Sequence, residues 1–329
     1  MSNVAIVGAT GAVGQEFLKI LAERNFPVNE LRLLATQRSA GKKIAWRGQD
    51  LEVQETTHDS FKGIDIALFA GGSSSTEYAQ SAVKSGAVVI DNSSAFRMDP
   101  NVPLVVPEVN PEDVNWHKGI IANPNCSTII MVVALKPILD LAGIKRIVVS
   151  TYQAVSGAGR EGIEELEDQV RAWSKDEELV SRVFPYQIAF NLVPRIDLFG
   201  EGDYTKEEWK MVKETQKIFH LPELAITATT VRVPVLRSHS ESINIETEHK
   251  VGIPEIREAL AKAQGVIVVD DPSQDRYPMP WFSADTDGVY VGRIREDFSI
   301  KTGINLWVVG DQIRKGAATN AVQIAELIL

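Results

Sequence analysis

The sequence predicts an α/β protein of two domains, the first around a parallel sheet and the second an α+β domain with a mostly antiparallel sheet. Over the first 125 residues, short apolar runs typical of buried strands alternate with helical segments, which is typical of a parallel sheet with helices on both faces. After residue 126 the strand-like runs become longer, and fewer helices separate them. The chain has 329 residues, enough for two domains with buried cores.

The first domain is expected to open with a strand, a glycine-rich turn at 8–14 and a helix at 15–24, because Phe17, Leu18 and Leu21 recur at helical spacing. Its strands are predicted at 3–7, 31–35, 64–70 and 87–90, with a polar helix at 76–85.

The second domain begins with an apolar helical run, which Pro137 is expected to kink. Helices are predicted at 128–141, 160–173, 206–219, 254–264 and 315–329. Strands are predicted at 145–154, 225–235, 242–248, 289–298 and 304–309, and the segment 270–287, rich in Pro, Asp and Ser, is predicted to be a long loop.

Composition excludes several function classes. Lys and Arg number 34 against 44 Asp and Glu, a net charge of −10, which argues against nucleic acid as a partner because phosphate binding needs clustered cations. The single cysteine excludes a disulfide framework and a cysteine-rich metal site, and no metal is expected. The longest apolar run, residues 129–135, is far shorter than the ~20 residues of a membrane helix. Without a targeting segment either, we expect a soluble cytoplasmic protein without a membrane partner.

The glycine-rich turn predicts a Rossmann-like nucleotide site. Gly8, Gly11 and Gly14 follow a strand and precede a helix, so backbone N–H groups can approach a pyrophosphate at the positive end of the helix dipole. A tight turn without a ligand is the alternative. At the end of the second strand stand Arg38 and Ser39 rather than an acidic residue, which favours the 2′-phosphate of NADP(H) over NAD.

Cys126 is the main catalytic candidate. Asn125 and two further polar or proline residues precede it and an apolar helical run follows, so its thiol is expected at a helix N-terminus, where a thiolate is stabilised. A small buried packing residue is the alternative. Of the five histidines, His239 is the best partner for a nucleophile, because Arg232 and a strand lead into its Ser-His-Ser turn; an ordinary turn histidine is the alternative.

Five motifs in order make the chain resemble the aspartate-semialdehyde dehydrogenase family. They are GATGAVG at 8–14, DNSSAFR at 91–97, VPEVN at 106–110, NPNCST at 123–128, and Arg232 followed by RSH at 237–239. The resemblance implies NADPH-dependent reductive dephosphorylation of L-aspartyl 4-phosphate to L-aspartate 4-semialdehyde through a cysteine thioester. It also implies a place in lysine (through diaminopimelate), threonine, methionine and isoleucine biosynthesis, and a homodimer or homotetramer.

The resemblance also assigns roles to single residues. It implies Cys126 as nucleophile, His239 as acid/base catalyst and Gln153 as the residue that orients the substrate. Substrate contacts are implied for Arg232 at the α-carboxylate, Arg97 and Lys210 at the phosphate, and Asn125 and Glu207. The implied cofactor contacts are Gly8, Thr10, Gly11, Ala12, Val13, Arg38, Ser39, Ser156, Gly157 and Asn320.

By the same resemblance the terminal helix returns to the first domain. The cofactor-binding domain is then 1–124 with 311–329, and the catalytic and dimerisation domain is 125–310. N-acetyl-γ-glutamyl-phosphate reductase is an alternative, but its cysteine typically lies between Gly and Tyr, whereas Asn125 and Ser127 flank Cys126 here. A catalytically inactive binding protein of the same fold is a second alternative, which the presence of both Cys126 and His239 disfavours.

Overall fold

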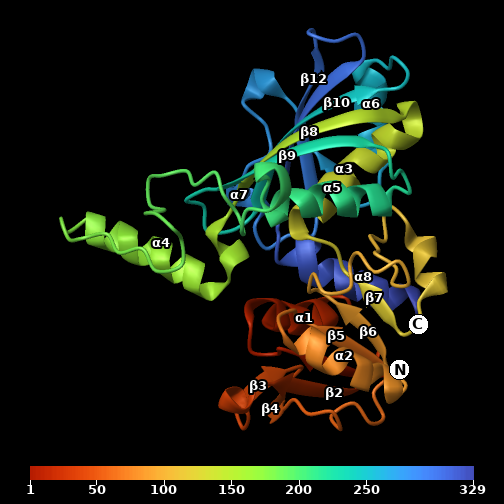
Figure 1. Ribbon diagram of the computed structural model, residues 1–329, viewed down its shortest axis with the longest axis vertical. Helices are drawn as coiled ribbons and strands as arrows, with labels where there is room; N and C mark the ends of the chain where they lie inside the picture. The colour runs from red at the N-terminus through yellow and green to blue at the C-terminus, as the bar shows by residue number, and fades with distance from the viewer. The chain divides into compact units, whose positions relative to one another are not determined.

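The computed structural model describes all residues, 1–329, which form two compact units (Figure 1). The first comprises Met1–Asn125 and Gly316–Leu329, and the second comprises Cys126–Lys315. These units differ from the predicted domains, 1–124 with 311–329 and 125–310, by one residue at the first boundary and by five residues at the second. None of the helices combines the length and the apolar character that crossing a bilayer requires.

The first unit is built on a seven-stranded sheet in the order β3-β4-β2-β1-β5-β6-β7, parallel except for the antiparallel β3–β4 pair. Its strands are β1 (Ser2–Val7), β2 (Val28–Ala35), β3 (Lys43–Trp46), β4 (Gln49–Glu55), β5 (Ile66–Phe69), β6 (Val88–Asp91) and β7 (Ile120–Ala122). Its helices include α1 (Ala12–Glu23) and α2 (Ser74–Lys84). The central strands β1 and β5 are almost wholly apolar and buried, which confirms the parallel-sheet prediction.

The terminal helix α8 (Thr319–Leu327) belongs to this unit and contacts α1 and β6, as predicted. Its small residues Ala321 and Ala325 are buried in the same core as Phe17 and Leu21 of α1. The predicted helix start at 315 is wrong, because a π-helical turn, Arg314–Ala318, precedes α8.

The second unit is built on a six-stranded sheet in the order β11-β12-β13-β10-β8-β9. Its strands are β8 (Ile144–Gln153), β9 (Ala225–Arg232), β10 (His239–Thr247), β11 (Val266–Val268), β12 (Val289–Asp297) and β13 (Gly303–Gly310). The pairs β8–β9 and β11–β12 are parallel and the other three are antiparallel, which confirms a mostly antiparallel sheet.

Three helices pack against this second sheet: α3 (Cys126–Ala142), α5 (Lys206–Ile218) and α6 (Ile253–Lys262). Every residue of α3 from Ser127 to Leu135 is buried, so α3 is the central helix of this unit. A capping box at Thr205 and Glu208 fixes the start of α5.

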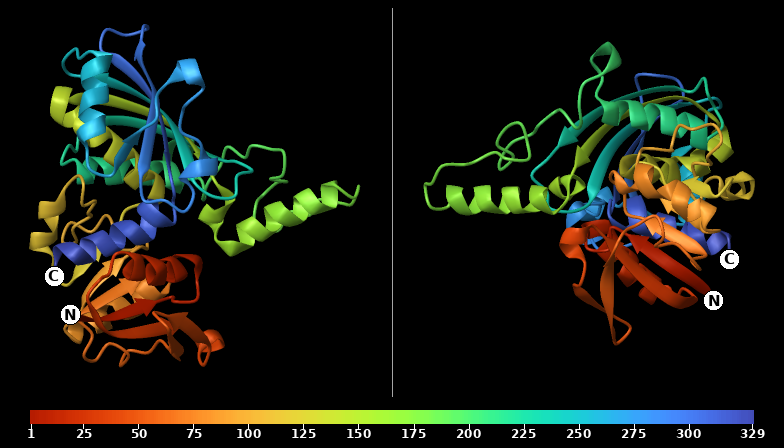
Figure 2. Two further views of the ribbon diagram at one scale, coloured as in Figure 1. Left: turned by 180° about the vertical axis from the view of Figure 1, so that it is seen from behind. Right: turned by 60° about the horizontal axis from the view of Figure 1, so that its bottom comes forward.

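Helix α4 (Arg160–Trp173) projects from the second unit, and an irregular segment returns beside it (Figure 2). Two buried polar side chains of α4 fasten that segment. A carboxyl oxygen of Glu165 accepts the backbone N–H groups of Arg182, at 2.8 Å, and Val183. The amide oxygen of Gln169 accepts those of Ile188 and Ala189, both at 2.9 Å. These bonds satisfy backbone donors that have no secondary-structure partner.

The prediction of one long loop at 270–287 is partly wrong. A 3-10 turn, Pro272–Gln274, and a one-turn helix, α7 (Pro280–Ser283), interrupt it. Each starts at a proline, whose fixed φ suits the first helical position.

Candidate active site

The glycine turn between β1 and α1 fits a dinucleotide in backbone geometry. Gly8 has φ +84°, a conformation that favours glycine. A Cβ on Gly14 would lie 2.2 Å from the carbonyl oxygen of Gly8, so only glycine lets α1 pack this closely. No acidic residue stands in the first turn of α1 and no side chain caps it. An anion can therefore approach this helix N-terminus without a competing carboxylate.

A cavity of about 240 Å³ lies beside this turn within the first unit, lined among others by Gly8, Thr36, Gln37 and Ser74. The predicted cofactor residues Arg38 and Ser39 follow β2 in a 3-10 turn, Gln37–Ser39. Arg38 is exposed, whereas Ser39 is buried and accepts a long hydrogen bond of 3.4 Å from Thr10 Oγ1. This brings Thr10 of the glycine turn together with Ser39, two of the predicted contacts.

Arg97 and Asn320 brace the segment that leads to Cys126. Arg97 Nε and Nη2 donate to the carbonyl oxygens of Asn123 (2.9 Å) and Asn92 (2.8 Å). Asn320 Nδ2 donates to the Val105 carbonyl oxygen (3.0 Å) and to Asn123 Oδ1 (2.7 Å). Both side chains are buried, so each has a positioning role that the sequence did not indicate. Their assigned contacts with phosphate and cofactor stay predictions.

The second unit gathers the other predicted catalytic groups at one end of its sheet. Gln153 ends β8 beside Arg232, which ends β9, and His239 begins β10 opposite Gly310 of β13. A Cβ on Gly310 would lie 2.9 Å from the side chain of Ile130, one turn into α3. The first turn of α3, which starts at Cys126, therefore lies against this end of the sheet.

Arg232 is the central cation of this group. It is buried, and its Nη1 donates to the carbonyl oxygen of Ala154 at 2.7 Å. Burial lowers the pKa of Arg232, while the negative charges of Glu207 and the Cys126 thiolate oppose that shift. The same attraction favours the thiolate of Cys126, whose side chain is partly exposed at the helix N-terminus.

His239 is wholly buried, and its Nδ1 accepts the backbone N–H of Ala154 at 3.1 Å. Burial, aided by the positive charge of Arg232, holds the pKa of His239 well below its ordinary value of 6.5. Gly157, which has no side chain, leaves room for the side chains of Arg232 and His239. A Cβ there would lie 2.7 Å from Arg232 Nη1 and 3.4 Å from His239 Nε2. The predicted cofactor contact at Gly157 stays a prediction, but the backbone there also has a packing role.

Lys210 forms ion pairs with two carboxylates, Glu207 and Asp197. The sequence alone did not indicate that these two carboxylates lie side by side. Its Nζ lies 3.0 Å from Glu207 Oε2 and 3.0 Å from Asp197 Oδ2. Burial works against its charge, but Glu207 and Asp197 outweigh burial and raise the pKa of Lys210. Glu207 also accepts from Gln153 Nε2 at 3.4 Å. A phosphate at Lys210 would compete with these two carboxylates, so this assignment stays a prediction.

A cavity of about 470 Å³ opens on the same group within the second unit. Arg182, Arg195 and Arg232 line it together with Asp197 and Phe184. Three guanidinium groups and one carboxylate leave this cavity cationic although the chain carries a net charge of −10. It therefore suits a small dianionic ligand.

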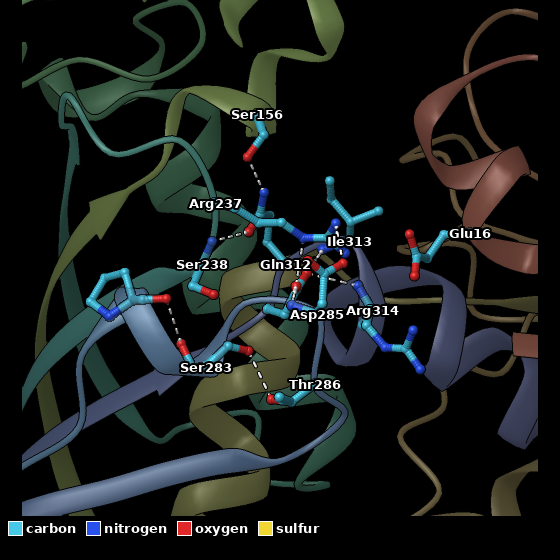
Figure 3. A network of polar contacts seen from close by, with 12 residues as sticks. Glu16, Ser156, Arg237, Ser238, Ser283, Asp285, Thr286, Gln312, Ile313 and Arg314 are labelled. Atoms are coloured by element: carbon cyan, nitrogen blue, oxygen red, sulfur yellow. Dashed lines mark hydrogen bonds and ion pairs between the residues drawn. The ribbon is translucent and has the colours of Figure 1, made fainter. Parts of the chain in front are cut away.

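Gln312 connects Ser156, in the 3-10 turn Val155–Ala158, to Ser238, the residue that precedes β10 (Figure 3). Its Nε2 donates to Ser156 Oγ, and its Oε1 accepts the backbone N–H of Ser238 at 2.8 Å. Ser238 is buried with φ +74°, an uncommon conformation for a residue with a side chain. Because Ser238 directly precedes His239, this bond fixes the backbone that leads to His239.

Asp311, the residue directly before Gln312, stabilises the same region. Its Oδ2 accepts Arg237 Nε (2.6 Å) and the backbone N–H of Asp285 (2.7 Å). Its Oδ1 accepts the backbone N–H groups of Ile313 and Arg314. Four donors satisfy this fully buried carboxylate, so it joins three separate segments of the second unit.

Glu241 is a buried acid that the sequence did not single out. It lies two residues beyond His239 on the same face of β10 and is fully buried, and neither carboxyl oxygen has a hydrogen-bond partner. Burial raises the pKa of Glu241 well above its ordinary value of 4.5. The folded protein therefore holds a proton on Glu241 at pH values where the unfolded chain has released it.

We expect Glu241→Gln to remove a pH dependence of stability. The folded pKa lies above the unfolded one, so the wild-type free energy of unfolding falls as pH rises from 4.5 through the folded value. The slope from one such proton is at most about 1.4 kcal/mol per pH unit. Urea denaturation of both proteins at several pH values from about 5 to about 8 measures the difference. Parallel stability curves would show that Glu241 is ionised in the folded state.

Two family models match the chain, and with the fold they define its class. "Semialdehyde dehydrogenase, NAD binding domain" matches residues 3–117, and "Semialdehyde dehydrogenase, dimerisation domain" matches residues 135–315. The chain is a semialdehyde dehydrogenase with an NAD(P)-binding domain and a dimerisation domain, and it forms an oligomer.

The relatives place it within that class. Aspartate-semialdehyde dehydrogenase of Aquifex aeolicus is 60% identical over 99% of this chain and 98% of its own length. Aspartate-semialdehyde dehydrogenase II of Vibrio cholerae, solved in complex with ASA, has a TM-score of 0.96 at 49% identity and covers 100% of this chain and 98% of its own. The Candida albicans enzyme, solved with NADP, has a TM-score of 0.76 at 28% identity over 100% of this chain and 98% of its own.

The chain belongs to the aspartate-semialdehyde dehydrogenase family. Its activity is that of a phosphorylating aldehyde dehydrogenase in aspartate-family amino-acid biosynthesis.

Proposed function

We propose that Cys126 carries the covalent chemistry of this activity, the NADPH-dependent conversion of L-aspartyl 4-phosphate to L-aspartate 4-semialdehyde. The observation that supports this most directly is the place of the only cysteine. It is the first residue of the buried helix α3, and it interacts electrostatically with Arg232. The helix N-terminus and a cation both stabilise a thiolate, the form that attacks an acyl phosphate.

The other predicted site residues are proposed to bind and orient the substrate. Arg232 pairs with the α-carboxylate, because a planar guanidinium suits a planar carboxylate. Glu207 attracts the α-ammonium group, and Gln153, whose amide reaches Glu207, orients the acyl chain. By resemblance, Asn125 contacts the substrate, and Arg97 and Lys210 bind the phosphate that leaves.

The chemistry divides into two stages at Cys126. The thiolate displaces phosphate from the acyl carbon, which leaves a thioester on Sγ. The reduced dinucleotide, when bound, supplies the hydride for the second stage. After reduction, the C–S bond breaks and the aldehyde leaves, so Cys126 returns to its starting state.

The proposed cofactor is NADP(H), bound at the glycine turn with Arg38 and Ser39 at the 2′-phosphate. The backbone around Gly8 and Gly14 leaves space for a pyrophosphate, and the Candida albicans relative was solved with NADP. Ser156 and Gly157 are proposed to contact the nicotinamide end, and Asn320 to close the cofactor site.

Arg38→Ala is expected to weaken NADP(H) binding by about 10- to 100-fold while NAD(H) binding changes little, since only NADP carries the 2′-phosphate. Fluorescence titration of both reduced cofactors measures the ratio. Arg47→Ala is the matched control, since Arg47 lies over the Trp46 ring and faces no proposed ligand. Equal weakening of both cofactors by Arg38→Ala would exclude a contact with the 2′-phosphate.

The oligomer is proposed to be a homodimer, or a homotetramer built from such dimers, with the sheet of the second unit as the dimer face. Helices α3, α5 and α6 cover one face of this sheet. The other carries Tyr152, Ser242 and Trp307 and a cavity of about 340 Å³, so its aromatic groups remain half-exposed. Light scattering should give a particle mass that is a multiple of the 36.2 kDa chain mass. Ser242→Arg should reduce this particle mass, because it places a charge on the proposed dimer face.

The cytoplasmic location is likewise a proposal. A partly exposed thiol that must stay a nucleophile needs reducing surroundings, because oxidation would consume it.

One assay tests the proposed function as a whole. The purified enzyme with aspartate semialdehyde, NADP⁺ and inorganic phosphate should sustain NADPH formation over many turnovers only when phosphate is present. N-acetyl-glutamate semialdehyde serves as the competing substrate and should give a rate at least about 100-fold lower, because the acetyl group removes the α-ammonium charge that Glu207 attracts. Continuous NADPH formation over many turnovers without phosphate, or preference for the acetylated substrate, would contradict the proposal.

A further inference from the structure

Glu208 joins two elements of the second unit through its carboxylate. It is buried beside Glu207 in the first turn of α5, and each of its carboxyl oxygens accepts a backbone N–H group. Oε2 accepts from Thr205, the N-cap of α5 itself, at 2.7 Å. Oε1 accepts from Thr230 of β9 at 3.0 Å. The carboxylate is therefore part of a helix cap and also a bridge from the helix to the sheet.

The bridge reaches the sheet at its open edge, close to Arg232. Strand β9 is the outermost strand of the second sheet, and α5 lies beside it (Figure 1). The outer N–H groups of an edge strand have no strand partner of their own. Here the N–H of Thr230 donates to Glu208, and the N–H of Arg232 donates to the carbonyl oxygen of Val193 at 2.8 Å. Glu208 thus fixes the edge of β9 two residues before Arg232.

Two further contacts join the same segments, and both are weaker holds on Arg232. The hydroxyl groups of Thr205 and Thr230 lie 3.5 Å apart, at the limit of a hydrogen bond. The hydroxyl groups of Tyr204 and Thr227 lie 2.8 Å apart, but Thr227 is five residues from Arg232 along β9. The bond from Glu208 is closer to the arginine, and its acceptor is a carboxylate, which strengthens it.

Helix α6 shows that a helix cap alone does not require this arrangement. Glu255 occupies the same capping position in α6 and accepts the backbone N–H of Gly252 at 2.8 Å. Glu255 is exposed and makes no contact with another element. The second bond of Glu208, made by a buried oxygen to a neighbouring strand, therefore has a purpose other than starting the helix.

The two bridged elements carry opposite charges that interact. Glu207 on α5 acts on the guanidinium of Arg232 on β9. The roles proposed above give Glu207 the α-ammonium group and Arg232 the α-carboxylate of the substrate. Both substrate groups are bonded to one carbon atom, so a productive fit requires a set separation between the two side chains.

We propose that Glu208 is a positioning residue for substrate recognition. Its bridge from α5 to β9 sets the separation of Glu207 and Arg232, and thereby the affinity for the amino-acid end of the substrate. The inference rests on the proposed substrate roles of these two residues.

Glu208→Met removes both acceptors with a side chain of similar length that suits a helix. The KM for aspartate semialdehyde should rise about 10- to 100-fold while kcat stays within about 3-fold of wild type. The KM for NADP⁺ should stay within about 2-fold, because the glycine turn lies in the other unit.

Glu255→Met is the matched control, since it removes the glutamate of a capping box that has no bridge. Both of its KM values should stay within about 2-fold of wild type. A similar rise in KM for the two variants would mean that loss of any helix cap weakens the substrate site, and the proposal would be wrong.

Hydrogen exchange measures the bridge without substrate. The peptide that contains Thr230 should lose one slowly exchanging amide in Glu208→Met and none in Glu255→Met. Glu208→Gln keeps one acceptor for two donors, so its KM should rise only if the Thr230 amide exchanges faster. In either Glu208 variant, faster exchange with an unchanged KM, or a raised KM with full protection, would refute the positioning role.

A double substitution tests whether Glu208 acts through Arg232. Glu208→Met combined with Arg232→Lys should raise the KM for aspartate semialdehyde by less than the product of the two single effects, because the placement of an absent guanidinium no longer matters. The full product would contradict the proposal. If Arg232→Lys alone leaves this KM unchanged, the proposed substrate role of Arg232 fails; if it raises KM and Glu208→Met does not, only the positioning role fails.

Discussion

Replacing Cys126 with serine is expected to reduce turnover by about 10⁴-fold or more while the fold is retained. A serine hydroxyl fits the same volume at the start of α3, but at neutral pH it is not ionised by a helix N-terminus and Arg232. Because no other cysteine exists in the chain, no second thiol can replace it. Phosphate-dependent NADPH formation measures the loss.

The same variant supplies its own controls. NADP(H) binding and the melting temperature should stay near the wild-type values, since the predicted cofactor turn at Gly8 to Gly14 lies in the other unit. A Cys126→Ser enzyme within about 10-fold of wild type would place the nucleophile elsewhere and remove the basis for the thioester.

Arg232→Lys is expected to lower kcat/KM by about 10² to 10³-fold, mainly through KM for the semialdehyde. Lysine keeps the charge but loses the planar pair of donors, and the bond from Nη1 to the Ala154 carbonyl oxygen is lost with them. Ala154 also donates to His239, so part of the loss should appear in kcat. Steady-state kinetics in both directions separates the two contributions.

Arg182→Lys is the matched control for this substitution. Arg182 lines the same cavity, but its side chain is 55% exposed and pairs with Asp168 at the surface. We expect less than about a 3-fold change in kcat/KM. Similar losses for both arginines would mean that the cavity attracts the substrate by its general charge and that Arg232 makes no specific contact.

The elements that the sequence predicted well have their signal in local pattern. The strand before Gly8 and the helix after Gly14 are fixed by an apolar run and by glycines that permit close packing. The edge hairpin of β3 and β4 was missed because its side chains, apart from the buried Val53, are half-buried or exposed and form no apolar run. The start of α8 was misplaced because the π-helical turn continues the helical pattern of the sequence.

The predicted site residues have a signal in the local sequence pattern, whereas the groups that hold them in place do not. Cys126, Arg232 and His239 stand in recognisable motifs, and the structure places them at one end of a single sheet. Their partners are set by tertiary contacts. Asp197 reaches Lys210 from a loop, and Gln312 reaches Ser238 across 74 positions of sequence. A third such contact, from the Ala154 N–H to His239 Nδ1, involves a backbone group that no side-chain pattern can indicate.

The accumulation of a thioester on Cys126 tests the central claim most directly. Mixing the enzyme with aspartate semialdehyde and NADP⁺ in the absence of phosphate should produce a burst of one NADPH per active site and then stop. Mass spectrometry of the digested protein should find one aspartyl group on the peptide that contains Cys126, and adding phosphate should remove it and restart NADPH formation. A protein that forms no burst, or that carries the aspartyl group on another residue, would contradict the assignment of Cys126 as the nucleophile.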